Sequence, residues 1–380
     1  MQVSALCAGC DKMSFVTQAL YVFDGHNDLP WAMRELCGYD FAEADLLGGE
    51  ARLQTDVPRL RSGGVGAQFW SVFVPCSLAG QAAVTATLEQ IDFVRSLVAR
   101  YPNEFSLVTT AHQVELAARA GRVASLMGME GGHSIDCSLG TLRMMHLLGV
   151  RYLTLTHNEN VPWADSATDE PLLGGLSEFG RDVVREMNRL GMFVDLSHVS
   201  PDVMRDALAT SIAPVIFSHS CAKALCNINR NVPDEILVDM ARGGGVCMVT
   251  FVPMFVHQGV ANWYAGCLDI VEQRGGDRRR FSDVDKVLVE RILTDPPPAC
   301  TVDDVADHVE HVRDVAGVEH VGIGGDYDGA TFFPDRMGDV ASYPLLLDTL
   351  RGRGWSEADL TRLAHGNVVR AMREMELAAD

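Results

Sequence analysis

The sequence predicts a (β/α)8 barrel of the TIM type, in the α/β class, and three observations lead to that prediction. Short apolar segments rich in Val, Ile, Leu, Phe or Met recur along the chain, at residues 20–24, 66–74, 123–129, 151–156, 192–197, 214–218, 245–252 and 320–325. Helical patterns separate most of these segments. Near-continuous apolar strands that alternate with helices indicate a parallel sheet covered on both faces. Eight such units are the number that closes a barrel.

The clearest helical pattern lies between the fourth and fifth of these segments, at residues 179–190. Apolar side chains fall at helical spacing there, and Gly191 follows as a C-cap. Residues 142–148 show a similar pattern. A doubly wound open sheet would also alternate strands and helices, so it is the main alternative. No Gly-x-Gly-x-x-Gly motif opens a helix after the first strand, which counts against the dinucleotide-binding version of that fold.

The length of 380 residues and the hydrophobic content of 47 % allow one large barrel domain with a substantial core. We therefore treat residues 1–380 as a single domain, with residues 1–14 as a peripheral N-terminal segment. Residues 76–122 are longer than an ideal barrel connection, and we expect extra helix there, including residues 84–100.

A second long stretch, residues 253–319, is expected to leave the barrel as an excursion rather than to form a separate domain. It contains the charged, exposed stretch 272–280 and three consecutive prolines at 296–298. The basic run Arg278–Arg280 within it is interpreted as solvated surface and not as a binding patch.

Composition limits the function classes. The chain has 31 basic and 51 acidic residues, a formal net charge of −20, which repels phosphate backbones and anionic lipid. We therefore expect no nucleic acid partner and no membrane association. The ten cysteines are scattered, and several lie in apolar segments, as Cys247 does, which favours a reducing compartment. The spacing of Cys7 and Cys10 is CxxC, but no second pair follows at zinc-finger distance. With no export or lipid-anchor signal recognised, a cytoplasmic location is expected.

Potential metal ligands follow six of the apolar segments. They stand at His26 and Asp28, Glu130 and His133, His157, Asp195 and His198, His219, and Asp326 and Asp328. Because the carboxyl ends of barrel strands share one face, we expect these side chains to meet there. Five other histidines are interpreted as ordinary structural residues, namely His112, His146, His308, His311 and His365.

Counting ligands indicates the chemistry. His26, Asp28, Glu130, His198 and His219 are too many for one open catalytic zinc site. They suffice for two metal ions if Glu130 bridges the pair and a hydroxide forms a second bridge. Two ions about 3.5–4 Å apart would lower the pKa of a bound water and polarise a carbonyl group, which is hydrolase chemistry.

The chain closely resembles the membrane (renal-type) dipeptidase family, metallopeptidases of the amidohydrolase-like barrel group, in order from about residue 15 to the C-terminus. The matching motifs are DGHND (24–28), QFWS (68–71), GMEG (128–131), LTLTHN (153–158), PWAD (162–165), GLSEFG (175–180), DLSHVS (195–200), PVIFSHS (214–220), RNVPD (230–234) and GGDYDG (324–329). The resemblance implies two Zn²⁺ ions per chain. His26 and Asp28 would hold one, His198 and His219 the other, and Glu130 would bridge them.

The resemblance also implies catalytic and substrate-binding roles. His157 would stabilise the oxyanion of the tetrahedral intermediate. Asp326 would contact the free amino group of the substrate, take a proton from the bridging water and pass it to the leaving amine. Arg230 would bind the C-terminal carboxylate, for which a guanidinium group is well shaped. Asp24 and Asp328 are candidates for orienting the ligands.

The predicted function is therefore zinc-dependent hydrolysis of dipeptides by attack of a metal-bridging hydroxide, with L-Xaa-D-Xaa dipeptides among the substrates that the family accepts. One alternative is another binuclear amidohydrolase that acts on a β-lactam, an N-acyl amino acid or a lactone. Such enzymes commonly begin with His-x-His and use a carboxylated lysine, whereas this chain has His26, Asp28 and Glu130. A more remote alternative is a non-catalytic metal-binding barrel. The resemblance also implies a homodimer.

The chain departs from the family pattern in two places. Some members have a substrate-contacting tyrosine after the seventh strand, whereas residues 250–255 here (TFVPMF) contain no tyrosine. Animal members have a cysteine just after the residue that corresponds to His157, whereas this chain has Asn158-Glu159-Asn160. We therefore expect Cys76 to be unpaired.

Overall fold

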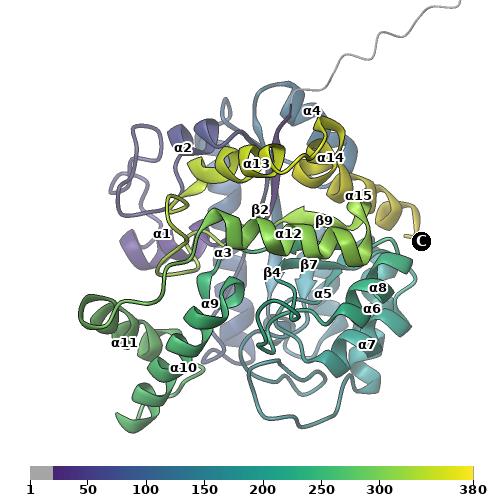
Figure 1. Ribbon diagram of the computed structural model, residues 1–380. Coiled ribbons are helices and arrows are strands. Elements are labelled where there is room, and N and C mark those ends of the chain that lie inside the picture. Colours follow the sequence, from purple (N-terminus) through teal and green to yellow (C-terminus); the bar gives the residue numbers. More distant parts are fainter. Residues whose placement is uncertain (1–19, 380) are drawn as a thin grey trace, which may run out of the picture.

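The closed parallel barrel is confirmed by the computed structural model, which describes residues 20–379 (Figure 1). The strands in this range are β1 (Val22–Asn27), β2 (Val65–Ser71), β3 (Phe105–Leu107), β4 (Val123–Glu130), β5 (Val150–Thr154), β6 (Phe193–Asp195), β7 (Ile216–Ser220), β8 (Val246–Val249) and β9 (Val321–Ile323). All paired strands are parallel. Pairing of β2 with both β1 and β4, and of β9 with both β8 and β1, closes the ring. The segment 1–14 and the pair Cys7 and Cys10 lie outside the described residues.

Each of the eight predicted apolar segments overlaps one strand of the barrel. The short strand β3 was not predicted. Its three residues pair with Val123–Ser125, ahead of the part of β4 that pairs with β5. This strand lies within the stretch 76–122, in which only additional helix was predicted.

Helices surround the barrel (Figure 1). They are α1 (Leu29–Cys37), α2 (Val57–Ser62), α3 (Gln81–Arg100), α4 (Ala111–Arg119), α5 (Leu139–Leu148), α6 (Glu178–Leu190), α7 (Pro201–Thr210), α8 (Asp234–Arg242), α9 (Pro253–Val256), α10 (Gln258–Gln273), α11 (Phe281–Thr294), α12 (Val302–Ala316), α13 (Tyr343–Gly352), α14 (Glu357–Thr361) and α15 (Asn367–Leu377). The helices predicted at 84–100, 142–148 and 179–190 are present as α3, α5 and α6. The hydroxyl group of Ser177 caps the N-terminus of α6, and Gly191 ends that helix in the left-handed conformation, with a φ of 68°.

Aromatic side chains fill the inside of the barrel. Phe69 on β2 contacts both Phe23 on β1 and Tyr152 on β5, with ring centroids 5.5 and 4.9 Å apart. These rings and Phe193 on β6 have no exposed surface. Burying each of them away from water contributes on the order of 2 kcal/mol.

The predicted excursion is shorter than expected, and its C-terminal boundary at residue 319 is wrong. Helices α10 and α11 project from the barrel and pack on each other through a small core of their own, which includes Trp263 and Leu288 (Figure 1). Helix α12 instead packs against α8, α13 and β9 of the barrel. It buries a regular apolar stripe that includes Val305, Val309 and Val312, so it is a barrel helix.

The polar end of the barrel is formed where the parallel strands terminate. Strand β1 extends to Asn27, further than predicted, and its pairing with β2 is irregular between Asp24 and Asn27. His26 therefore lies within β1, whereas Asp28 lies beyond it, in the turn that opens α1. This turn brings Asp28 Oδ2 back to 3.3 Å from His26 Nε2.

Candidate active site

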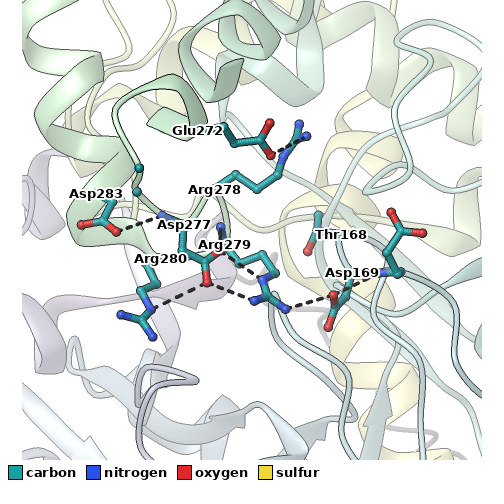
Figure 2. A pocket seen from close by; sticks show the side chains of 11 residues that line it. Thr168, Asp169, Glu272, Asp277, Arg278, Arg279, Arg280 and Asp283 are labelled. Carbon is teal, nitrogen blue, oxygen red and sulfur yellow. Dashed lines mark hydrogen bonds and ion pairs between the residues drawn. The ribbon is translucent and has the colours of Figure 1, made fainter. Parts of the chain in front are cut away.

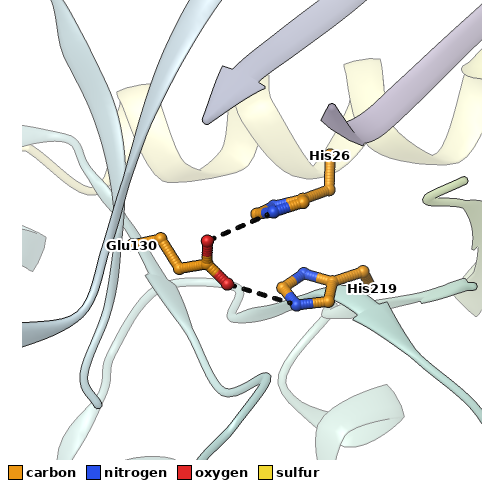
Figure 3. Close-up of side chains that lie close together, drawn as sticks. All are labelled: His26, Glu130 and His219. Carbon is orange, nitrogen blue, oxygen red and sulfur yellow. Dashed lines mark ion pairs between the residues drawn. The ribbon is translucent and has the colours of Figure 1, made fainter. Parts of the chain in front are cut away.

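All five predicted metal ligands lie together at the carboxyl end of the barrel. They come from the ends of β1, β4, β6 and β7 or from the residues that directly follow, and each is at most 6 % exposed. Glu130 stands in the middle of the group. Its Oε2 lies 3.4 Å from His26 Nε2, whereas its Oε1 lies 2.9 Å from His198 Nε2 and 3.5 Å from His219 Nε2 (Figure 3). Each oxygen of this carboxylate therefore faces different histidines.

The unsatisfied polar atoms of this cluster show that it fits metal ions. His26 Nε2, Asp28 Oδ1 and His198 Nδ1 are buried and have no hydrogen-bond partner. Leaving such an atom unsatisfied costs about 1–3 kcal/mol. Ligand atoms of His26, Glu130 and His219 converge closely enough to hold one ion, and so do those of two overlapping groups that include His157 or Asp326. Imidazole nitrogen and carboxylate oxygen together are a donor set suited to a borderline divalent cation.

A second layer of hydrogen bonds orients the two histidines that face Glu130 from β1 and β7. His219 Nδ1 lies 2.8 Å from Ser218 Oγ, which in turn donates to Asp195 over 2.6 Å. Because the Ser218 hydroxyl uses its proton on Asp195, His219 Nδ1–H is the donor to Ser218. The lone pair of His219 is thereby left on Nε2, which faces Glu130. His26 Nδ1 lies 2.8 Å from the hydroxyl of Tyr152, which is also buried and also reaches the ring nitrogen that faces away from Glu130.

Burial and mutual charge set the protonation of the cluster. Burial alone would raise the pKa of Glu130, but His26 and the hydrogen bond from His198 hold it well below its usual range. Burial, with Arg230 nearby, lowers the pKa values of His198 and His219. Glu130 is therefore ionised and these two histidines are neutral, the states in which both kinds of side chain bind a metal.

Asp326 lies beside this cluster, on a turn with unusual backbone conformations. Asp326 and Asp328 both have positive φ, 65° and 64°, and the N–H of Asp326 donates to the carbonyl of His26 over 3.1 Å. A Cβ at Gly329 would lie 2.3 Å from Asp28 Oδ2 and 2.5 Å from Asp326 Oδ1, so only glycine allows both carboxylates to occupy this place. Burial, then the neighbouring carboxylates of Asp28 and Glu130, raises the pKa of Asp326 well above its usual value.

His157 and Arg230 complete the predicted set. His157 Nε2 lies 3.9 Å from Glu130 Oε1. Burial lowers the pKa of His157 to about 4, so its imidazole is neutral. Arg230 is 4 % exposed, its guanidinium lies 4.9 Å from the ring centroid of Phe255, and burial lowers its pKa to about 10. Its Nε and Nη1 atoms have no hydrogen-bond partner, and within residues 20–379 no carboxylate lies within ion-pair distance of it.

Sequence reasoning missed the residues that orient the ligands, above all Tyr152, Ser218 and Ser71, whose hydroxyl donates to Glu130 Oε2 over 3.1 Å. The sequence offered one signal. Each of these hydroxyl groups lies in a strand that carries a predicted metal ligand, or in a strand next to such a strand. Asp24, a candidate orienting residue, instead accepts hydrogen bonds from Gln68 and from the N–H of Gly325, and so joins β1 to the residues after β9.

Other sequence interpretations can be placed in the structure. The two ring nitrogens of His308 are bonded to backbone groups of Ala222 and Val256, which fits its interpretation as a structural histidine. His133 Nε2 donates to the carbonyl of Val74. Cys76 is unpaired, as predicted. In the described part of the chain, no helix combines the length and the apolar character needed to cross a membrane.

A polar hollow of about 540 Å³ lies between the turn that joins α10 to α11 and the loop after β5 (Figure 2). The basic run predicted to be solvated surface lines it. Arg279 pairs with Asp277 at 3.0 Å and with Asp169 at 3.1 Å, Arg278 pairs with Glu272, and Arg280 pairs with Asp277. Because the three guanidinium groups are already paired with carboxylates of this chain, the hollow offers no unpaired arginine to an anionic ligand.

Fold and site together define a (β/α)8-barrel protein with a buried cluster of histidines and carboxylates, suited to holding metal ions, at the carboxyl ends of its strands. The profile of the membrane dipeptidase family, peptidase family M19, matches residues 10–380. The chain belongs to this family of metallopeptidases, which confirms the resemblance seen in the sequence motifs.

Individual relatives agree with this assignment. Dipeptidase 3 of Mus musculus is 42 % identical over 358 residues, which cover 93 % of this chain and 64 % of the mouse protein. The chain thus spans less than two thirds of that relative's length. A metallopeptidase from Rhodobacter sphaeroides, solved with a phosphinate mimic of the dipeptide L-Ala-D-Ala, is 25 % identical, with a TM-score of 0.78 over 94 % of this chain and 99 % of that one. The probable dipeptidase PvdM from Pseudomonas aeruginosa shares the fold, with 23 % identity and a TM-score of 0.83 over 95 % and 96 % of the two chains.

Proposed function

We propose that the protein is a zinc-dependent dipeptidase. The observation that carries the proposal is the arrangement around Glu130, whose two carboxylate oxygens face separate histidines in a buried cluster with unsatisfied ligand atoms. Such a carboxylate is suited to bridging two cations.

Two Zn²⁺ ions are the proposed cofactors. His26 and Asp28 would hold one ion, His198 and His219 the other, and Glu130 would contribute one oxygen to each. When bound, the pair would lower the pKa of a water molecule and polarise the carbonyl group of the substrate. The hydrogen bond from His219 to Ser218 would keep the Nε2 lone pair of His219 turned toward the ions, and the contact with Tyr152 would hold the ring of His26 in place.

Arg230 and Asp326 would select a substrate with two free termini. The guanidinium of Arg230 is buried and has unused N–H groups, so it can donate two parallel hydrogen bonds to a C-terminal carboxylate. Asp326, beside His26 and Asp28, can accept hydrogen bonds from an N-terminal ammonium group. A dipeptide, which has an ammonium group and a carboxylate on either side of a single peptide bond, would satisfy both residues.

The chain's own residues then move the proton and stabilise the charge. Asp326 takes a proton from the attacking water as the carbonyl carbon becomes tetrahedral. The imidazole of His157 donates a hydrogen bond to the oxygen on which negative charge develops. Asp326 returns the proton to the nitrogen of the leaving amino acid, and the C–N bond breaks.

Hydrolysis of a dipeptide panel by chelator-stripped and zinc-reloaded protein tests this function. The phosphinate complex of the Rhodobacter sphaeroides relative makes L-Ala-D-Ala, beside L-Ala-L-Ala, the first substrate to try. We expect turnover that vanishes on stripping and returns with zinc. If protein loaded with about two zinc ions cleaves no dipeptide, the proposal is wrong, and β-lactams, N-acyl amino acids and lactones become the next substrates. A cytoplasmic location and a homodimer stay predictions, tested by cell fractionation and by the mass of the protein in solution.

A further inference from the structure

A free thiol lies against the imidazole proposed to stabilise the oxyanion. Cys76, in the loop after β2, has its Sγ atom 3.6 Å from His157 Nδ1. This distance lies within the range of hydrogen bonds that involve sulfur, and a thiol is a weak donor. The contact joins residues 81 positions apart in the sequence, and sequence analysis gave Cys76 no function.

We propose that Cys76 is a positioning residue for His157. Its S–H group donates to His157 Nδ1 and thereby holds the imidazole in the tautomer that carries its proton on Nε2, the nitrogen that faces the metal centre.

The surroundings of the other ring nitrogen support this direction of the hydrogen bond. His157 Nε2 faces Glu130 Oε1 at 3.9 Å. An Nε2 lone pair would be repelled by this carboxylate, whereas an Nε2–H group is attracted to it. With the proton on Nε2, Nδ1 is an acceptor that needs a donor, and Cys76 is its partner. Burial raises the pKa of the Cys76 thiol to about 11, so the thiol keeps its proton.

The ring itself is held in place. It packs against Phe73 and His198, with ring centroids 4.8 and 4.4 Å away. The hydroxyl of Ser166 donates to the backbone carbonyl of His157 over 2.6 Å. With the ring position fixed by these contacts, the tautomer decides whether the ring presents a proton or a lone pair to the substrate.

The consequence for catalysis rests on the proposed function. An Nε2–H group stabilises the developing oxyanion, whereas an Nε2 lone pair repels it. Because the oxyanion exists only after binding, loss of the Cys76 donor should lower kcat and leave KM unchanged.

NMR of zinc-loaded protein with ¹⁵N-labelled histidine tests the tautomer directly, and the His157→Gln variant assigns the resonances. In the wild type we expect an unprotonated Nδ1 and a protonated Nε2 at His157. Cys76→Ala should shift these resonances toward a mixture of tautomers, and Cys76→Ser should restore them. Cys37→Ala is the matched control, because Cys37 is a half-buried thiol that donates to the carbonyl of Met33. A protonated Nδ1 in the wild type, or an unchanged spectrum in Cys76→Ala, would overturn the proposal.

Kinetics on L-Ala-D-Ala provide the second readout. Cys76→Ala should lower kcat about fivefold, as expected for one neutral hydrogen bond, with Cys76→Ser close to the wild type and KM constant. A kcat of Cys76→Ala equal to that of the wild type would also contradict the proposal. If no dipeptide is hydrolysed at all, the proposed function fails, but the NMR measurement still decides the tautomer.

Discussion

Two clusters of charged side chains in this molecule differ in how far their charges are satisfied. The hollow beside α10 and α11 is lined by arginines and carboxylates that pair with one another and remain partly exposed (Figure 2). The cluster around Glu130 is buried and keeps ligand atoms without hydrogen-bond partners. The arginines of the first cluster are paired within the chain, whereas the second cluster keeps unpaired ligand atoms that a bound cation would satisfy. What distinguishes the candidate site from the hollow is therefore the convergence of unpaired ligand atoms, and not the volume of a cavity.

Removing the central carboxylate should have the largest effect. Glu130→Ala removes the carboxylate that the two proposed zinc ions share. We therefore expect zinc content to fall and kcat/KM to drop by about 10⁴-fold or more. Elemental analysis after dialysis, alongside the dipeptide assay, measures both. If the variant retained two zinc ions per chain and most of its activity, Glu130 could not be the bridge.

Replacing the proton carrier should separate chemistry from metal binding. Asp326→Asn is isosteric, so both zinc ions should stay, while kcat should fall about 10²- to 10³-fold because an amide cannot accept the proton. Rate measurements on protein of verified zinc content provide the comparison. Wild-type turnover in this variant would remove Asp326 from the mechanism.

Arg230→Lys tests substrate binding without changing the charge. The ammonium group cannot form two parallel hydrogen bonds, so KM for dipeptides should rise about 10-fold with little change in kcat. A dipeptide with an amidated C-terminus is the matched substrate control, because it has no carboxylate and its KM should differ little between the variant and the wild type. An equal KM for both proteins on free dipeptides would exclude Arg230 as the carboxylate site.

Tyr152→Phe removes only the hydroxyl that contacts His26 Nδ1. Loss of such an orienting partner should weaken zinc binding about 10-fold, with the fold intact. Competition with a zinc-binding dye measures the affinity, and circular dichroism checks the fold. Unchanged affinity would show that His26 keeps its orientation without this hydrogen bond.

The smallest effect is expected in the other cluster. Arg279→Gln breaks ion pairs with Asp277 and Asp169 that are partly exposed, so the free energy of unfolding should change by no more than about 1 kcal/mol. The dipeptidase kcat/KM should stay within about twofold of the wild type, and Arg278→Gln serves as the matched control. A large loss of activity in Arg279→Gln would mean that the two clusters are not functionally separate.

Much of this molecule could be predicted because the signals are local. The eight barrel strands are apolar runs, and the ligands stand at their ends in the sequence. The predictions were wrong where residues that are close in space, but distant in the sequence, determine the structure. Strand β3 exists through its pairing with β4, and α12 belongs to the barrel because its apolar face fits there. The contacts of Tyr152 with His26 and of Cys76 with His157 join residues far apart in the sequence, so no spacing in the sequence indicates them.

Anomalous X-ray diffraction at the zinc absorption edge, on crystals of zinc-loaded protein, tests the central claim most directly. We expect two peaks per chain, one beside His26 and Asp28 and one beside His198 and His219, each within bonding distance of one oxygen of Glu130. A fully loaded crystal with no peak at Glu130, or with zinc bound elsewhere in the chain, would contradict the proposed metal centre.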